Sequence, residues 1–179
     1  MRQRILHNHR IILRAPEPED LEIMYKMENL PEMWAVSNVT VPYSRYTLKR
    51  YIENCRNDIY NDGELRLMIQ LTENQKVVGT VDLIDFTPLH ERAEVGIAIL
   101  EDYRKQGIAR EALELLRDYA FKQLHIHLLY AYIAADNNAS LHLFKACGFT
   151  EGPVLKDWLR DENGYKDVFL LQNIATSSF

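Results

Sequence analysis

The sequence lacks cysteine-rich segments, long apolar runs and low-complexity tracts, and each lack excludes a class of protein. Its 179 residues contain two cysteines, Cys55 and Cys147, too few to indicate a disulfide framework or a thiolate metal site. No apolar stretch approaches the length of a membrane span, and the opening "MRQRILHNHR" has no apolar segment typical of a secretory signal. We therefore expect a cytoplasmic protein with two buried or half-buried thiols, no metal ion and no membrane contact.

Basic residues are also too few for a general nucleic-acid-binding protein. The chain has 21 Lys and Arg against 26 Asp and Glu, which gives a formal net charge of −5 at pH 7. Because nucleic-acid binding depends mainly on basic patches that contact phosphates, we expect no nucleic-acid partner. The sequence has no G-K-[ST] segment to indicate a P-loop and no G-x-G-x-x-G segment to indicate a dinucleotide fold. The acidic balance is compatible with a cationic substrate.

The composition, 47% hydrophobic and 26% charged, is typical of a globular domain, and no linker divides residues 1–179. We therefore expect a single domain. Strands are expected at residues 10–16, 65–71, 76–86, 91–100 and 128–135, and on both sides of a turn at 161–164. Helices are expected at 17–30, 47–60, 108–123 and 138–148, with an irregular segment at 31–44. This order predicts an α/β (α+β) fold with a largely antiparallel sheet flanked by helices.

The stretch "YRKQGIAREALELL" places a lone glycine, Gly107, where the helix at 108–123 begins. The apolar residues of that helix share one stripe: Ala109, Ala112, Leu113, Leu116 and Ala120. The free N–H groups and positive dipole end of a helix attract anions, and glycine lets an oxyanion approach the backbone. Arg104, Lys105 and Arg110 add positive charge there. The residues alone leave two interpretations open, a diphosphate site or a glycine needed only for a tight turn among solvated cations.

Several segments resemble the GNAT family of N-acetyltransferases. "RKQGIA" matches the family's Q/R-x-x-G-x-G/A signature, "AEVGIAI" resembles its cofactor-lining strand, and "DNNASLHLFKACGFTEG" resembles its second signature. The opening "LRAPEPEDLE" resembles the family's first strand and helix, so that the resemblance covers about residues 10–172. Within the family, "RAEVGIAILEDYRKQGIA" and "YKDVFLLQ" resemble the branch of spermidine and ribosomal-protein-alanine acetyltransferases.

The resemblance implies a GNAT fold with about seven strands, in which acetyl-CoA binds as co-substrate in a cleft between two splayed strands. Backbone bonds to the pantetheine arm are implied for Ile97, Ala98 and Ile99. Contacts with the diphosphate are implied for Arg104, Lys105, Gln106, Gly107, Ile108 and Ala109. Asn137 and Phe144 are implied to touch the cofactor from the second splayed strand and the helix after it. Asn137 also suits a helix cap, and both roles are compatible.

Direct acyl transfer needs a base that takes a proton from the acceptor ammonium. It also requires that the departing CoA thiolate be stabilised or protonated. The resemblance implies that Glu94 is the base, whereas from the sequence alone a solvated strand charge that opposes Arg92 or another cation is the more common case. Many family members carry a tyrosine, read as the acid, where this chain has Phe144, and a phenyl ring cannot donate a proton. The thiolate then leaves without a protein acid, or water or Tyr103, Tyr130 or Tyr132 replaces the missing hydroxyl.

The expected acceptor is a primary amine, either on a polyamine or other small molecule or at a protein N-terminus. The segment "WAVSNVTVPYS" lacks the acids that the spermidine branch carries there, which argues against a polyamine. Trp34, Tyr43 and Tyr46 either form a wall of the acceptor pocket or are ordinary core aromatics. Phe144 also keeps open a non-catalytic acyl-CoA-binding sensor or interaction module, and an aminoglycoside or amino-sugar acetyltransferase is a third alternative. Analogy with the family suggests a homodimer.

Overall fold

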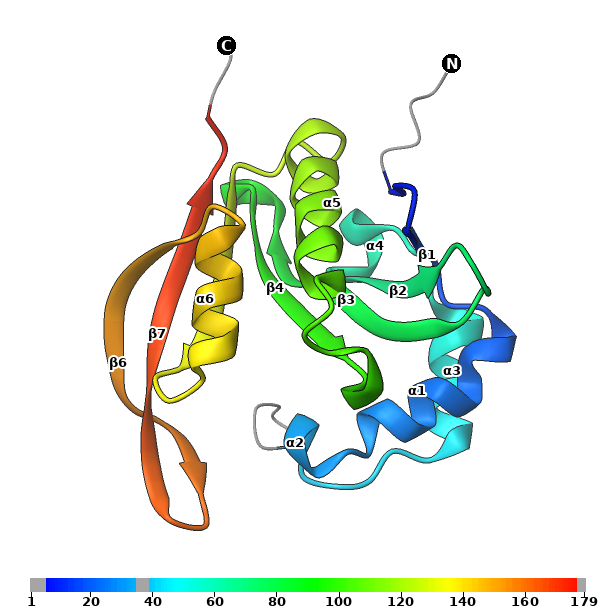
Figure 1. The fold of residues 1–179 in the computed structure, drawn as a ribbon, viewed down its shortest axis with the longest axis horizontal. Coiled ribbons are helices and arrows are strands. Elements are labelled where there is room, and N and C mark those ends of the chain that lie inside the picture. The colour runs from blue at the N-terminus through cyan, green and yellow to red at the C-terminus, as the bar shows by residue number, and fades with distance from the viewer. Residues whose placement is uncertain (1–5, 35–38, 177–179) are drawn as a thin grey trace.

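The computed structural model describes residues 6–34 and 39–176, which form one open sheet with helices packed against it (Figure 1). The strands are β1 (Ile11–Arg14), β2 (Leu65–Leu71), β3 (Val77–Thr87), β4 (Arg92–Ile99), β5 (Leu128–Ala134), β6 (Thr150–Asp161) and β7 (Gly164–Ile174). Their order is β1-β2-β3-β4-β5-β7-β6, and neighbours are antiparallel except β4 and β5, which run parallel. The expected mixed, mostly antiparallel sheet of seven strands is confirmed.

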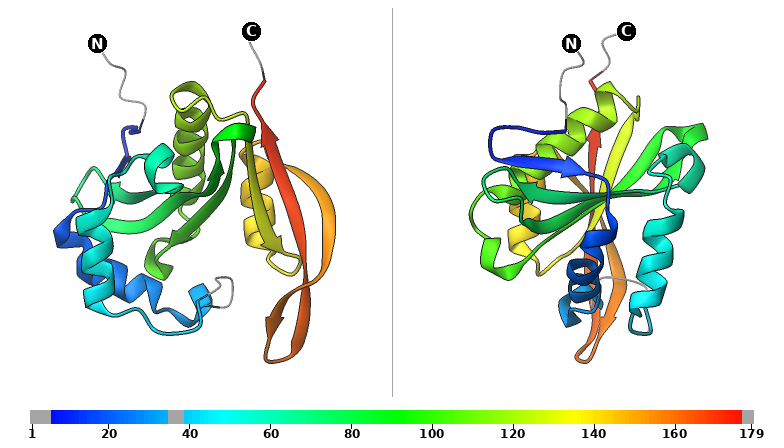
Figure 2. Two further views of the ribbon diagram at one scale, coloured as in Figure 1. Left: turned by 180° about the vertical axis from the view of Figure 1, so that it is seen from behind. Right: turned by 90° about the vertical axis from the view of Figure 1, so that its right-hand side faces the viewer.

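The helices are α1 (Leu21–Glu28), α2 (Pro31–Trp34), α3 (Arg45–Asn54), α4 (Ile59–Asp62), α5 (Ile108–Lys122) and α6 (Asn138–Ala146). Short 3-10 turns lie at η1 (Pro18–Asp20), η2 (Pro88–His90) and η3 (Glu101–Tyr103). α5 and α6 pack on one side of the sheet, and α3 lies on the other (Figure 2). The predicted stripe of α5 is confirmed, because Ala112, Leu113, Leu116 and Ala120 are all buried in the main core, with Ala109 half-buried at its start.

A second, smaller core lies on the opposite face of the sheet. It joins Met24 of α1, Leu48 of α3 and Met68 of β2. Strand residues alternate between the two faces, so the neighbours of Met68 in β2, Leu67 and Ile69, belong to the main core. The sheet therefore separates an α5 and α6 face from an α1 and α3 face.

The helix expected at 47–60 is wrong in extent, because two helices with a break between them occupy this region. α3 ends where Cys55 takes an extended conformation, and Asn57 has a positive φ of 54°. Asp58 then caps α4 by accepting a hydrogen bond from a backbone N–H of the first turn. Asn readily adopts the left-handed region and Asp favours helix caps, so these residues break the helix despite its apolar spacing.

The segment at 31–44, expected to be irregular, begins with the short helix α2. Trp34 Nε1 donates a hydrogen bond to the Glu28 carbonyl oxygen at 3.0 Å, which fixes α2 against the end of α1. Residues 35–38 lie outside the described part of the chain, and no helix or strand forms at 39–44.

The two thiols are placed as expected, with Cys55 half-buried and Cys147 buried. Within residues 6–34 and 39–176, no helix combines the length and the apolar character that a bilayer span requires. The same residues contain no cluster of three or more His, Cys, Asp or Glu side chains that could hold a metal ion.

Candidate active site

The parallel pair of strands at the centre of the sheet opens partway along its length. Glu94 and Tyr130 are the last residues of β4 and β5 to pair, although β4 continues to Ile99 and β5 to Ala134. β4 keeps its pairing with β3 to its end, so residues 97–99 have one backbone edge along which no β5 residue pairs. This is the expected splaying of the two strands. A chain with amide groups, such as pantetheine, fits such an edge because it can supply the hydrogen bonds of a missing strand.

Gly107 follows β4 and η3 along the chain and is the N-cap residue of α5. Its φ of 81° lies in the left-handed region, which glycine adopts with little cost. A methyl group placed on Gly107 would have a single neighbour within 4 Å among the described residues, Nη1 of Arg10 at 3.7 Å. Glycine is therefore needed here for its conformation and not for close packing. The open space leaves room for an anion to approach the N-terminus of α5, so the turn fits a diphosphate.

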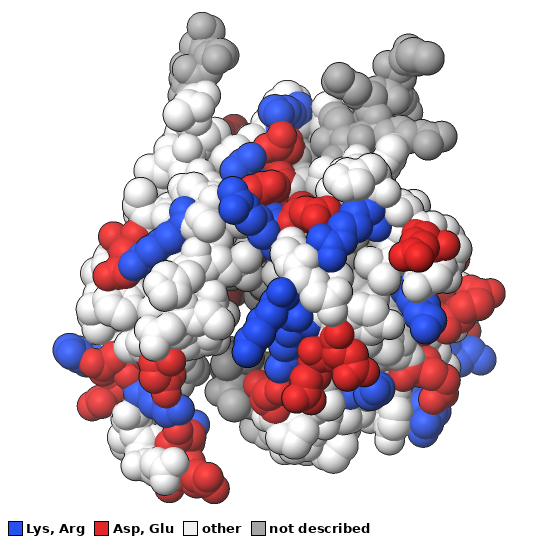
Figure 3. Space-filling model, viewed as in Figure 1, with Lys and Arg blue, Asp and Glu red and all other residues white. Residues whose placement is uncertain are grey.

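The cations around Gly107 differ in how much charge they leave free. Arg104 contacts the carboxylate of Glu32, and Arg110 pairs with Glu114 at 2.9 Å along α5. Lys105 has no carboxylate partner in the described part of the chain. Figure 3 shows Lys and Arg side chains gathered at the edge of the hollow beside α6. The expectation that the three cations simply add positive charge is therefore too simple, because two of them are neutralised by carboxylates.

Glu94 lies where the two strands begin to diverge, on the face of the sheet opposite α5. Its neighbours in β4, Ala93 and Val95, are buried in the main core, so alternation points Glu94 to the other face. Burial, and second the negative charge of Asp85, raises the pKa of the Glu94 carboxyl to about 7. A carboxylate with this pKa is suited to accept a proton near neutral pH, because it is substantially ionised there and more basic than an ordinary glutamate.

A cavity of about 210 Å³ lies on the same face as Glu94. Ile84, which pairs with Glu94 across β3 and β4, is part of its lining. The charged groups in the lining come from separate elements and are Glu28, Glu64, Arg66 and Asp82. Tyr43 also lines the cavity, as the sequence allowed, whereas Tyr46 lines an adjoining cavity of about 400 Å³ and Trp34 lines neither.

Arg66 is enclosed by two of these carboxylates. Its Nη2 contacts Asp82 Oδ2 at 2.8 Å, and its Nη1 contacts Glu28. Glu64 lines both cavities and has no ion-pair partner among the described residues. The sequence signal for these residues is weak, because Glu28, Arg66 and Asp82 lie far apart along the chain and share no motif. The cavity lining has more carboxylates than guanidinium groups only because the fold brings these separate segments together.

Asn137 and Phe144 occupy α6 and its cap. The Asn137 side-chain oxygen accepts a hydrogen bond from the Ser140 N–H at 3.1 Å, which confirms the capping role. Phe144 is only 3% exposed and packs edge-to-face on Phe149, with ring centroids 5.0 Å apart. The phenyl ring is thus a core residue in this structure, and contact of Asn137 or Phe144 with the cofactor stays a prediction.

A row of aromatic side chains runs outward from Glu94. Tyr130 lies beside Glu94, Tyr132 packs edge-to-face on Tyr130, and Trp158 of β6 stacks on Tyr132 at 5.7 Å. Burial first, and then the charge of Glu94, raises the pKa of Tyr130, so its hydroxyl stays protonated at neutral pH. The two tyrosines share a face because they are two residues apart on β5. No pattern in the sequence could have predicted that Trp158 joins them.

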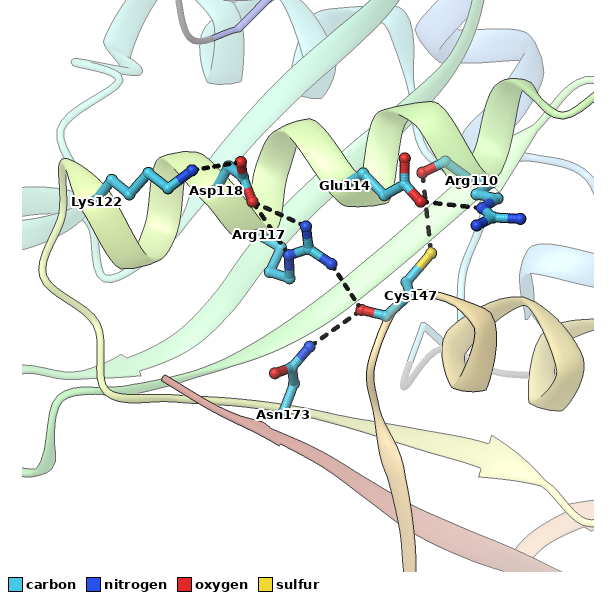
Figure 4. Close-up of polar contacts among 7 residues, drawn as sticks. All are labelled: Arg110, Glu114, Arg117, Asp118, Lys122, Cys147 and Asn173. Atoms are coloured by element: carbon cyan, nitrogen blue, oxygen red, sulfur yellow. Dashed lines mark hydrogen bonds and ion pairs between the residues drawn. The ribbon is translucent and has the colours of Figure 1, made fainter. Parts of the chain in front are cut away.

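A hydrogen-bond network holds the end of α6 against α5 and β7 (Figure 4). The Cys147 carbonyl oxygen accepts one bond from Arg117 Nη1 at 3.1 Å and another from Asn173 Nδ2 at 3.2 Å. Arg117 also pairs with Asp118 on α5 at 2.9 Å. The network fixes α6, with its Asn137 cap, relative to α5, whose N-terminus carries Gly107.

Comparison with known proteins agrees with this geometry. Residues 10–150 match the family model of the GNAT acetyltransferase domain. The chain is 27% identical over 172 residues to the spermidine N(1)-acetyltransferase of Vibrio cholerae serotype O1, which covers 93% of this chain and 95% of that protein. It is 31% identical over 111 residues to the ribosomal protein bS18-alanine N-acetyltransferase of Escherichia coli K12, which covers 62% of this chain and 73% of that protein.

Solved structures give the same result. A crystal structure of spermidine N-acetyltransferase from Vibrio cholerae in complex with CoA and spermine has a TM-score of 0.81 with this chain. The two share 27% sequence identity over 93% of this chain and 96% of that one. Another structure of the Vibrio cholerae enzyme, with a TM-score of 0.77 and 27% identity over 93% of this chain and 95% of that one, is dodecameric. A homodimer of the present chain stays a prediction.

The splayed strands, the open glycine turn and the match over residues 10–150 together define the class. The chain belongs to the GNAT acetyltransferase family and is an N-acetyltransferase that uses acetyl-CoA.

Proposed function

We propose that the protein transfers an acetyl group to a primary amine of a polyamine, with Glu94 as the general base. The observation that supports the choice of acceptor is the cavity that reaches Ile84, the strand partner of Glu94, because the carboxylates in its lining outnumber its one guanidinium. A polyamine is a chain of ammonium groups, so a binding site needs more negative than positive charge along its length. The absence of acids in "WAVSNVTVPYS" does not argue against a polyamine in this proposal, because Glu28, Glu64 and Asp82 come from other parts of the chain.

Each side chain has a definite task in this proposal. Acetyl-CoA supplies an activated acetyl thioester. The edge of β4 at 97–99 and the turn at Gly107 hold the pantetheine arm and the diphosphate, so that the thioester lies near the point where the strands separate. Glu94 takes a proton from the acceptor ammonium, directly or through one water, and the free amine then attacks the acetyl carbon. The bond from the acetyl carbon to sulfur breaks, CoA leaves as a thiolate, and the second amine proton passes to that thiolate directly or through water. Tyr130 stays protonated beside Glu94 and can donate a hydrogen bond within the site.

We assign Glu64 to hold the second ammonium of the acceptor, because Glu28 and Asp82 already form ion pairs with Arg66. Glu64→Gln should raise the KM for spermidine about three- to tenfold, because an interaction with a partly exposed charge contributes on the order of 1 kcal/mol. It should leave kcat unchanged and barely affect a monoamine of similar length. The measurement is steady-state kinetics with both acceptors.

Glu53→Gln is the matched control, because Glu53 lies on the same side in α3 but pairs only with exposed Lys49, at 3.8 Å. Equal effects of Glu64→Gln on spermidine and on the monoamine would contradict the assignment. Efficient acetylation of a peptide N-terminus or an aminoglycoside, with no acetylation of polyamines, would contradict the proposed acceptor.

A further inference from the structure

Arg10, just before β1, reaches the N-terminus of α5 and meets a carboxylate there. Glu111 lies in the first turn of α5, and its N–H donates to the Gly107 carbonyl oxygen at 3.2 Å. Arg10 Nη1 donates to Glu111 Oε1 at 2.9 Å, and Asn8 Nδ2 donates to Glu111 Oε2 at 2.8 Å. Both carboxylate oxygens are therefore occupied by groups from the N-terminal segment.

The pair is also adjacent to the turn that would receive a diphosphate. Arg10 Nη1 lies 3.7 Å from the position of a methyl group on Gly107. The Arg10 and Glu111 side chains are 35% and 24% exposed, so the pair is partly shielded from water and its charges are screened less than those of fully exposed groups. Gly107 and Glu111 are four residues apart and so lie on the same side of the helix.

A carboxylate in the first turn of a helix is favoured by the helix dipole, but an anionic ligand at the same N-terminus is favoured by the same field. An unpaired Glu111 would therefore repel the diphosphate. Of the cations in this turn, Arg104 and Arg110 are already paired with carboxylates, which leaves Lys105 and the Arg10 guanidinium to offset the charge of Glu111.

We infer that Arg10 is an electrostatic positioning residue of the diphosphate site, which neutralises Glu111 and so keeps the N-terminus of α5 attractive to CoA. The inference rests on the proposed use of Gly107 as the diphosphate turn. It differs from a purely structural role, in which the pair only ties the N-terminal segment to α5. If Arg10 has the positioning role, Arg10→Gln and Glu111→Gln change the Kd for CoA in opposite directions. If the pair is only structural, both variants change it in the same direction.

The test is calorimetric measurement of the Kd for CoA with the full chain and its variants. Arg10→Gln should raise the Kd about two- to fivefold at low salt, and Glu111→Gln should lower it by a similar factor, as expected for charges at a helix N-terminus. The double variant should return close to the starting Kd. All shifts should shrink in about 1 M salt, where the screening length falls to about 3 Å.

Acetyl-pantetheine is the matched ligand, because it lacks the diphosphate, and the KM for it should not change in any of these variants. Arg45→Gln is the matched protein control, since Arg45 makes a similar carboxylate pair with Glu22, at 2.8 Å, that joins α3 to α1. Weakened CoA binding in both Arg10→Gln and Glu111→Gln, or a parallel change with acetyl-pantetheine, would overturn the inference. Failure of the unmodified protein to bind CoA would instead overturn the proposed function.

Discussion

As the proposed general base, Glu94 should set the pH dependence of the reaction. Its carboxyl has a pKa of about 7, raised by burial and by Asp85, so only above this pH is most of it ionised and able to accept a proton. The rate should therefore rise as the pH increases through about 7. An ordinary solvated glutamate would already be ionised throughout this range.

Glu94→Gln should lower kcat by about 10²- to 10⁴-fold at pH 8 and abolish the rise near pH 7, because the general base is lost. The check is a pH profile of kcat/KM, with Glu73→Gln in the exposed β2 to β3 turn as the control. Unchanged rates would show that another group or solvent takes the proton.

The same substitution should alter stability in a direction fixed by the pKa. The folded protein binds the Glu94 proton more tightly than the unfolded chain, so this contribution is complete below about pH 4.5 and is lost as the pH rises through about 7. Glu94→Gln avoids that loss and should raise the free energy of unfolding above pH 7 by on the order of 1 kcal/mol, given the partial exposure of the group. Denaturant titrations at pH 5 and pH 8 measure the difference.

Phe144 removes the hydroxyl that many GNAT enzymes carry, and the structure packs its ring against Phe149. Phe144→Tyr should raise kcat by less than about tenfold, because a thiolate leaves readily, whereas a missing essential acid would make the gain about 10²-fold or more. Burying the new hydroxyl should lower the free energy of unfolding by about 1–3 kcal/mol. Steady-state kinetics and denaturant unfolding of this one variant separate the two effects.

At the scale of secondary structure elements, the turn before α5 has a close control elsewhere in the chain. Gly107 and Gly63 have φ values of 81° and 71°, and a methyl group on Gly63 would meet no atom within 4 Å in the described structure. Alanine at either position should lower stability by about 1 kcal/mol. Only Gly107→Ala should raise the Kd for CoA, by about tenfold or more, because a hydrogen bond to a charged group contributes about 1.5–3 kcal/mol. Calorimetry that finds equal affinities for both variants would contradict a diphosphate site at Gly107.

The sequence predicted those elements whose signals are local. The stripe of α5 and the glycine before it marked both the helix and its start, and these predictions are confirmed. The helix expected at 47–60 failed because apolar spacing continued across Asn57 and Asp58, whose backbone and capping preferences decided the outcome. The backbone and capping preferences of these two residues thus outweighed the helical pattern expected over the fourteen residues 47–60.

At the scale of the whole molecule, the charges of the candidate site come from distant parts of the chain. Arg10 and Glu111 are 101 residues apart, and Glu28 meets Arg66 across 38 residues. Periodicity and motifs report on neighbours in sequence, so they could predict the glycine turn and, through family resemblance, Glu94. They could not predict which carboxylates remain unpaired or which cation neutralises them.

Competition between acceptors in one vessel is the most direct test of acetyl transfer to a polyamine. The protein would receive acetyl-CoA and equal concentrations of spermidine, a monoamine, an aminoglycoside and a peptide with N-terminal alanine, with products identified by mass spectrometry. We expect the acetyl group to appear mainly on a primary amine of spermidine. Preferential acetylation of the peptide or the aminoglycoside, or CoA binding without any acetylated product, would contradict it.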